Sequence, residues 1–211
     1  MSSQPEIAPS VLDVVPVMPV VVLDDLAHAV PVARALVAGG LPAIELTLRT
    51  PVALDAIRAI ASEVPEILVG AGTVTTPAQA KEALEAGAQF LVSPGSTRSL
   101  LQAMQDTGLP FLPGTATVSE VLAALEAGCT ELKFFPAEAS GGAAYLKSVA
   151  SPVPAARFCP TGGITLASAP SYLALANVGC VGGSWITPAD ALAAGDWDRV
   201  TRLAAEAAAL G

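Results

Sequence analysis

The chain has 211 residues, of which 53% are hydrophobic, and its net charge is −9. This length allows one domain with a full core, so we expect a single domain over residues 1–211. The acidity argues against nucleic acid or a membrane surface as a partner, and it requires that an anionic substrate meet locally held positive groups. With no signal peptide pattern and no disulfide framework among Cys129, Cys159 and Cys180, we expect reduced thiols and a cytoplasmic protein.

Short β-rich runs alternate with alanine-rich helical stretches, and a glycine or proline lies at most junctions. The first dozen residues are expected to form a short helix or arm over the floor of the fold, and eight strand–helix units follow. Eight units at this length predict an α/β fold of the (β/α)8 TIM barrel type, with an open doubly wound sheet as the alternative. The predicted strands are Met18–Leu23, Ala43–Arg49, Ile67–Gly72, Gln89–Ser93, Pro110–Pro113, Glu131–Phe135, Ala156–Pro160 and Val178–Gly183, and the last helix is Asp196–Leu210.

His28, the only histidine, lies in the expected first helix, Asp25–Ala38, where a surface position is favoured. A metal centre built on imidazoles is therefore excluded, and a Ser/His/Asp triad is disfavoured. We expect neither a metal nor another cofactor.

Polar residues interrupt the second predicted strand in a regular alternation. Glu45, Thr47 and Arg49 share the phase that points toward the barrel axis. Burying charged side chains inside a small barrel costs free energy unless they form ion pairs or act on a ligand. This pattern therefore indicates either a structural ion network or a functional site. Glu45 and Arg49 are about 13 Å apart along a straight strand, so both can serve one small ligand only if Arg49 lies beyond the strand end and folds back.

The sixth predicted strand carries Lys133, one of only three lysines, in the same inward phase as Glu131 and Phe135. An amine held among apolar groups loses its proton more easily, and a neutral amine attacks a ketone to form a Schiff base. The alternative is a lysine that snorkels to water or pairs with an acid such as Glu131, to which we assign no role in a site.

The loops after the other strands are rich in glycine, proline and hydroxyl groups. Thr73 and Pro94 each end a predicted strand at the rim, where a tight turn or a rigid scaffold is the alternative to ligand contact. Paired glycines follow the last two strands, at Gly162-Gly163 and at Gly182-Gly183 before Ser184. Their backbone N–H groups match the phosphate site common in such barrels, which binds a dianion without needing lysine.

Taken together, these segments resemble the family of 2-keto-3-deoxy-6-phosphogluconate (KDPG) aldolase and 4-hydroxy-2-oxoglutarate (KHG) aldolase, class I aldolases that include an enzyme of the Entner–Doudoroff pathway. The resemblance runs nearly end to end, and its specificity rests on the combination of motifs. The motifs are Glu45-Leu46-Thr47-Leu48-Arg49-Thr50, Val69-Gly70-Ala71-Gly72-Thr73-Val74, Ser93-Pro94-Gly95, Pro113-Gly114, Lys133-Phe134-Phe135-Pro136-Ala137-Glu138, Phe158-Cys159-Pro160-Thr161-Gly162-Gly163-Ile164 and Gly182-Gly183-Ser184-Trp185.

The resemblance implies a homotrimer that cleaves a phosphorylated 2-keto acid to pyruvate and glyceraldehyde 3-phosphate. It makes Lys133 the Schiff-base lysine and Glu45 the general acid and base. It further implies that Arg49, Thr73 and Pro94 bind the substrate carboxylate, that Gly162, Gly163 and Ser184 bind the phosphate, and that Thr161 and Phe135 line the substrate.

Some rim residues depart from the expected family pattern, namely Asp24-Asp25, Ser96 and Thr115-Ala116. None of them removes a catalytic group, but they leave substrate preference open. The alternatives are KHG cleavage or oxaloacetate decarboxylation on the same lysine, a galactonate-series aldolase, which Thr161 disfavours, and a non-catalytic phosphate-binding barrel or engineered assembly scaffold.

Overall fold

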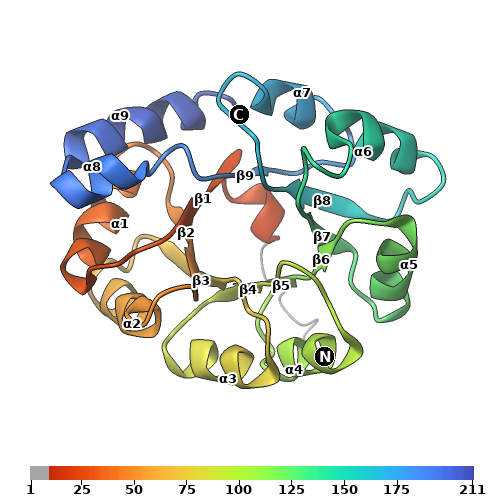
Figure 1. Cartoon of the computed structure of the whole chain (residues 1–211), viewed down its shortest axis with the longest axis horizontal. Helices are drawn as coiled ribbons and strands as arrows, with labels where there is room; N and C mark the ends of the chain where they lie inside the picture. The colour runs from red at the N-terminus through yellow and green to blue at the C-terminus, as the bar shows by residue number, and fades with distance from the viewer. Residues whose placement is uncertain (1–9) are drawn as a thin grey trace, which may run out of the picture.

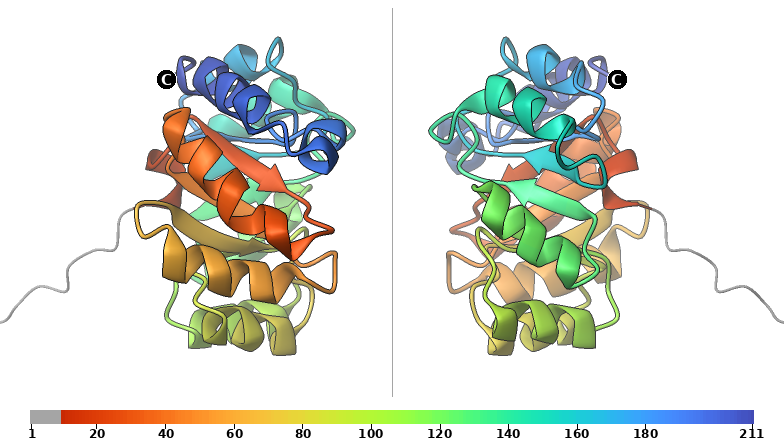
Figure 2. Two further views of the ribbon diagram at one scale, coloured as in Figure 1. Left: turned by 90° about the vertical axis from the view of Figure 1, so that its left-hand side faces the viewer. Right: turned by 90° about the vertical axis from the view of Figure 1, so that its right-hand side faces the viewer.

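A closed ring of parallel strands surrounded by helices makes up residues 10–211, the part of the chain that this computed structural model describes (Figures 1 and 2). The strands are β1 Val17–Val21, β2 Ala43–Thr47, β3 Leu68–Gly72, β4 Phe90–Val92, β5 Phe111–Leu112, β6 Gly114–Thr115, β7 Glu131–Phe134, β8 Arg157–Pro160 and β9 Val181–Gly183. The helices are α1 Ala29–Ala38, α2 Ala53–Glu63, α3 Pro77–Glu85, α4 Arg98–Asp106, α5 Val118–Glu126, α6 Gly142–Ala150, α7 Ala169–Leu173, α8 Ala189–Ala194 and α9 Trp197–Ala208, with short 3-10 turns η1 Val11–Asp13 and η2 Leu26–His28.

The order of the strands closes the ring. One series of parallel pairs runs β5-β4-β3-β2-β1-β9 and a second runs β6-β7-β8. Parallel bridges from Phe158 to Val178 and from Thr161 to Gly182 join the second series to the β9 side. At the other junction β5 and β6 follow each other directly along the chain. The predicted (β/α)8 barrel is therefore confirmed, and the open doubly wound sheet is wrong.

The fifth predicted strand, Pro110–Pro113, needs a correction. The structure has two short strands, β5 and β6, on either side of Pro113, and pairing continues to Thr115. Proline has no backbone N–H to donate to a neighbouring strand. It therefore interrupts the hydrogen bonding at Pro113, while the chain continues in the same direction.

Threonine side chains set the starts of several helices. Thr76 and Thr117 form capping boxes with Gln79 and Glu120, in which each threonine hydroxyl accepts from the backbone N–H three residues later and the side chain there accepts from the threonine N–H. The expected first helix starts less regularly, because η2 precedes α1 and His28 lies at their junction. His28 keeps part of its side chain at the surface, as predicted, and packs edge-on against the Trp197 ring, with ring centroids 5.3 Å apart.

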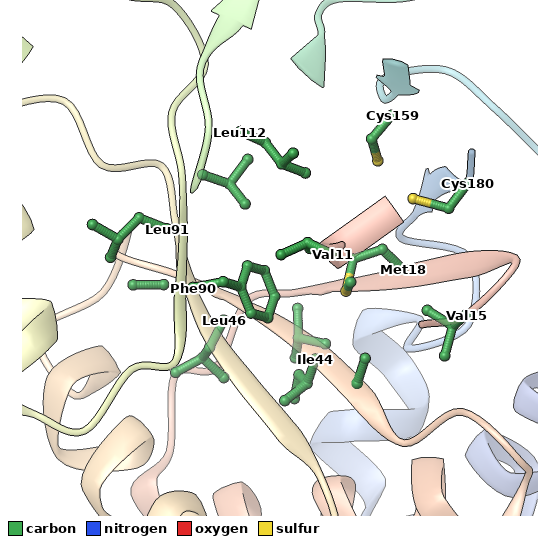
Figure 3. Packing of buried hydrophobic residues seen from close by; sticks show 14 of the residues in the cluster. Val11, Val15, Met18, Ile44, Leu46, Phe90, Leu91, Leu112, Cys159 and Cys180 are labelled. Atoms are coloured by element: carbon green, nitrogen blue, oxygen red, sulfur yellow. The ribbon is translucent and has the colours of Figure 1, made fainter. Parts of the chain in front are cut away.

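The barrel interior is apolar toward its floor (Figure 3). Gly70 leaves room for the ring of Phe90, which a Cβ at that position would strike. Cys159 and Cys180 lie close by as buried free thiols, which confirms the prediction for both. The neighbouring Cys159 thiol, together with burial, raises the pKa of the Cys180 thiol.

An ion network fastens the short η1 turn to the floor. Ser10 donates to Glu131 at 2.5 Å, and Arg157 pairs with Asp13 at 2.6 Å and with Glu131 at 3.4 Å. The guanidinium of Arg157 lowers the pKa of Asp13. The expected floor helix is thus confirmed for Val11–Asp13, and the remainder of that expectation, residues 1–9, lies outside the described residues. Glu131 belongs to this structural network, in line with the absence of a site role for it.

No helix within residues 10–211 has both the length and the apolar character needed to cross a bilayer. In the same part of the chain, no group of three or more histidine, cysteine or acidic side chains is arranged to hold a metal ion.

Candidate active site

Lys133 and Glu45 form a buried ion pair across the barrel. Lys133 comes from β7 and Glu45 from β2, and the Nζ lies 2.9 Å from Oε1. The two side chains are 5% and 1% exposed, so neither charge is screened by water. The Phe135 ring lies 5.6 Å from the amine and supplies an apolar wall. A primary amine and a carboxylate are therefore held together in a largely dry site at the carboxyl end of the strands.

Gly72 at the end of β3 makes room for this pair. A Cβ on Gly72 would collide with the carboxylate of Glu45, which lies on the neighbouring strand β2. The sequence explains Gly72 only as a place of close backbone approach; in the structure it is the space occupied by the acid. The position of Glu45 thus depends on a missing side chain as well as on its ion pair.

Replacing Gly72 by alanine is expected to displace Glu45 from Lys133 and to lower kcat by about tenfold or more, because proton transfer depends on the placement of the acid. Steady-state rates of keto-acid cleavage measure this effect. Gly95→Ala is the matched control, since a Cβ at that position would have no other atom within 4 Å. An unchanged kcat in Gly72→Ala, with the fold intact, would contradict the account of the Glu45 position.

Arg49 lies beyond the end of β2, as it must if it is to reach the same ligand as Glu45. The strand ends at Thr47, and Arg49 follows in a turn where its Nε donates to Thr73 Oγ1 at 3.1 Å. Thr73 has a φ of 58°, a left-handed conformation that is uncommon and strained for a residue other than glycine. Arg49 makes no ion pair with any carboxylate in the described part of the chain. Its guanidinium is therefore available to an anion.

A cavity of about 130 Å³ brings most of the predicted binding residues together. Its walls come from strands β1 and β9 and from the loops after β2, β7, β8 and β9. The glycine pair after β8 has φ values of 105° and 82°, which only glycine adopts without strain. The predicted residues that line the cavity are Arg49, Phe135, Thr161, Gly162, Gly163 and Ser184.

The remaining predicted residues do not line this cavity. Lys133 adjoins it through Phe135, and Thr73 adjoins it through Arg49. Pro94 is half-buried, and its backbone packs against Gly114, where a Cβ would collide with it. The structure gives Pro94 no contact with the cavity. A larger hollow of about 380 Å³ is lined by residues of α4 and α5 and by none of the predicted site residues, so its size does not mark the site.

Glu138 and Tyr172 also belong to this region, although the sequence pattern assigns them no role. Tyr172 donates its hydroxyl to Glu138 at 2.7 Å, directly behind Gly163. The one sequence feature that could have pointed to Glu138 is its place in the motif that begins at Lys133. The pairing with Tyr172, 34 residues away, has no local signature.

The arrangement suits covalent chemistry on a ketone. A buried amine can form an imine, the adjacent carboxylate can move protons, and the nearby glycine-rich backbone can bind an anion. These three parts meet at the carboxyl end of the barrel, where the active sites of such folds lie.

Comparison with known proteins agrees with this geometry. Residues 9–203 match the family described as "Aldolase: KDPG and KHG aldolase". The KHG/KDPG aldolase of Escherichia coli (strain K12) is 57% identical over 200 residues, which cover 95% of this chain and 94% of that protein.

Two solved structures extend the comparison. KDPG aldolase from Legionella pneumophila, with pyruvate captured at low pH as a covalent carbinolamine intermediate, has a TM-score of 0.92 at 46% identity, over 93% of this chain and 96% of that one. The aldolase of Zymomonas mobilis ZM4 with 3-phosphoglycerate has a TM-score of 0.89 at 49% identity, over 95% and 94%. On both sequence and fold, the chain belongs to the KDPG and KHG aldolase family.

Proposed function

We propose that this protein is a class I aldolase that cleaves 2-dehydro-3-deoxy-6-phosphogluconate to pyruvate and D-glyceraldehyde 3-phosphate through a Schiff base on Lys133. The observation that carries the proposal is the buried Lys133–Glu45 pair, 2.9 Å apart, beside a cavity with glycine-rich backbone. The similar proteins from Escherichia coli and Legionella pneumophila, one of them holding covalent pyruvate, support the same chemistry.

The reaction starts when Glu45 takes the proton of the Lys133 ammonium. The neutral amine attacks the C2 ketone to give a carbinolamine. Protonated Glu45 then gives its proton to the carbinolamine hydroxyl, which leaves as water, so that an iminium ion and the Glu45 carboxylate result. This cation accepts the electron pair of the C3–C4 bond when Glu45, again a carboxylate, removes the C4 hydroxyl proton directly or through one water. Glyceraldehyde 3-phosphate leaves, and an enamine of pyruvate remains. Protonated Glu45 returns a proton to C3, and water hydrolyses the resulting iminium ion to release pyruvate and to restore the Lys133 ammonium and the Glu45 carboxylate.

The rest of the site holds the two charged ends of the substrate. Arg49 suits the carboxylate because its planar fork binds two oxygens at once, and Thr73 and Pro94 complete that end. Gly162, Gly163 and Ser184 receive the phosphate with backbone N–H groups and a hydroxyl. Thr161, which is buried, and Phe135 line the substrate between these ends. This distribution answers the charge problem of an acidic protein with an anionic substrate.

A second activity, cleavage of KHG, is favoured by the name of the 57% identical Escherichia coli protein, which covers both substrates. Rates on KDPG, its galactonate-series epimer, KHG and oxaloacetate separate the candidates. The highest kcat/KM is expected for KDPG, with KHG lower because it lacks the phosphate. Equal kcat/KM on KDPG and KHG would refute the phosphate site, and anion binding without turnover of any of them would favour a non-catalytic barrel or scaffold.

We also propose that residues 1–211 form one catalytic domain, that the protein acts in the cytoplasm, and that it assembles as a homotrimer. Three buried free cysteines suit a reducing compartment. Light scattering of the purified protein is expected to give three times the chain mass of 21.1 kDa, and a monomer mass would overturn the trimer.

A further inference from the structure

A buried tyrosine and a carboxylate lie behind the glycine pair that follows β8. Tyr172, in α7, is 1% exposed and donates its hydroxyl to Glu138 Oε1 at 2.7 Å. Burial, the hydrogen bond and the charge of Glu138 all raise the pKa of Tyr172 well above its usual range, so its hydroxyl stays protonated and remains a donor. Within residues 10–211, Glu138 is its only hydrogen-bond partner.

Glu138 also contacts the glycine pair directly. Its backbone N–H donates to the carbonyl of Gly162 at 3.1 Å, and the preceding Ala137 donates to Thr161 at 2.8 Å. A Cβ on Gly163 would lie 2.8 Å from both Cβ and Cγ of Glu138. The stem of Glu138 therefore packs against the backbone of Gly163, whose φ of 82° turns the chain at this point.

These contacts grip the loop at both of its ends. The backbone of Glu138 holds the part of the loop that leaves β8, and its carboxylate holds α7, which the loop enters, through Tyr172. Space for the pair is kept by Gly142, where a Cβ would lie 3.2 Å from the Tyr172 hydroxyl. The start of the loop and the helix that it enters are thus both held by Glu138, and neither Glu138 nor Tyr172 lines the cavity.

The charge of Glu138 works against the ligand expected here. A carboxylate behind a phosphate-binding loop repels a dianion, so on electrostatic grounds alone an uncharged residue would bind phosphate better. The contribution that offsets this repulsion is geometric, because only an acceptor at this place satisfies the buried Tyr172 hydroxyl.

We propose that Glu138 and Tyr172 are positioning residues that hold the Gly162-Gly163 loop in the shape that receives the substrate phosphate. The proposal rests on the function proposed above, which assigns the phosphate to this loop. It predicts a selective defect, since loosening the loop weakens binding of the phosphate and leaves imine chemistry on Lys133 intact.

Three variants test the pair: Tyr172→Phe, Glu138→Ala and Glu138→Gln. The first two break the hydrogen bond and are expected to raise KM for KDPG by about 5- to 20-fold, as befits the loss of a buried polar contact. Their kcat/KM on KHG, which has no phosphate, and their trapping of pyruvate are expected to stay within about twofold of wild type. Glu138→Gln keeps an acceptor and removes the repulsive charge, so its KM for KDPG is expected to return to the wild-type value or below.

A calorimetric titration with inorganic phosphate gives a second readout that does not depend on Lys133 chemistry. The Kd for phosphate is expected to rise in Tyr172→Phe and Glu138→Ala and to stay at or below the wild-type value in Glu138→Gln. Equal losses on KDPG and KHG, an unchanged KM in Tyr172→Phe, or a Glu138→Gln variant as impaired as Glu138→Ala would each overturn the positioning role. Absence of a pyruvate adduct on the wild-type protein would instead refute the proposed function, and the phosphate titration alone would then decide the role of the pair.

Discussion

Lys133→Ala is expected to lower kcat for keto-acid cleavage by about four orders of magnitude or more, because the substitution removes the amine that forms the imine. The buried amine is the only nucleophile held against Glu45, at 2.9 Å, in the described part of the chain. Steady-state release of pyruvate measures the loss. The other two lysines give matched controls, since Lys81 and Lys147 are exposed on α3 and α6. Lys81→Ala and Lys147→Ala are expected to keep kcat within about twofold of wild type, in line with the small effects of most surface substitutions.

The same substitution also affects stability, so its fold needs a separate check. Removing Lys133 leaves the carboxylate of Glu45, 1% exposed, without its partner, and breaking a buried pair in this way costs about 3–5 kcal/mol. Lys133→Met fills the same space with an apolar chain and adds a second test. A folded Lys133→Ala or Lys133→Met protein that turns over near the wild-type rate would remove Lys133 from the mechanism.

Glu45→Gln is expected to form the imine with pyruvate and yet to lower kcat by about 10²- to 10⁴-fold, the usual contribution of a general acid or base. Glutamine matches the shape of glutamate and still offers an acceptor to the Lys133 Nζ, so the geometry of the site is kept. It cannot, however, take the C4 hydroxyl proton or return one to C3. Borohydride trapping and steady-state turnover, measured on the same sample, separate the two steps.

Glu131→Gln is the matched control for that experiment. Glu131 lies on the same strand as Lys133, but it belongs to the floor network with Ser10 and Arg157. Its kcat is expected to stay within about twofold of wild type. If instead Glu45→Gln turns over at the wild-type rate, another group moves the protons and the role proposed for Glu45 is wrong.

The sequence predicts those features that depend on local periodicity. Side chains alternate along a strand, so the residue order alone predicts the inward phase of Glu45 and Lys133, and the ion pair between them follows once the ring closes. The predicted strand Ala43–Arg49 is too long, because β2 ends at Thr47. The distance along a strand required only that Arg49 lie beyond the strand end if it serves the same ligand as Glu45, and the structure meets that condition. Eight repeated units are enough to predict the closed barrel over an open sheet.

Features that depend on contacts between distant residues were not predictable in this way. No pattern links Glu138 to Tyr172, or shows that Gly72 is the space for Glu45 and Gly70 the space for Phe90. These glycines appear in the sequence only as flexible positions. The side chains that require glycine at these positions belong to neighbouring strands, which come together only after folding.

Backbone details at the strand ends were also missed or incomplete. Pro113 divides the fifth strand instead of ending it, because a missing N–H interrupts a ladder without redirecting the chain. Thr73 takes a left-handed φ of 58° that no turn rule assigns to threonine, and its hydroxyl is thereby aimed at Arg49. The strain is specific to the tertiary setting of the rim.

The central claim is a Schiff base on Lys133, and intact mass after incubation with pyruvate and borohydride tests it most directly. The account predicts one pyruvyl adduct on the wild-type protein and on Lys81→Ala and Lys147→Ala, and none on Lys133→Ala, with peptide mapping placing it on Lys133. A folded wild-type protein that gains no adduct, or one that carries it on a lysine other than Lys133, would contradict the account.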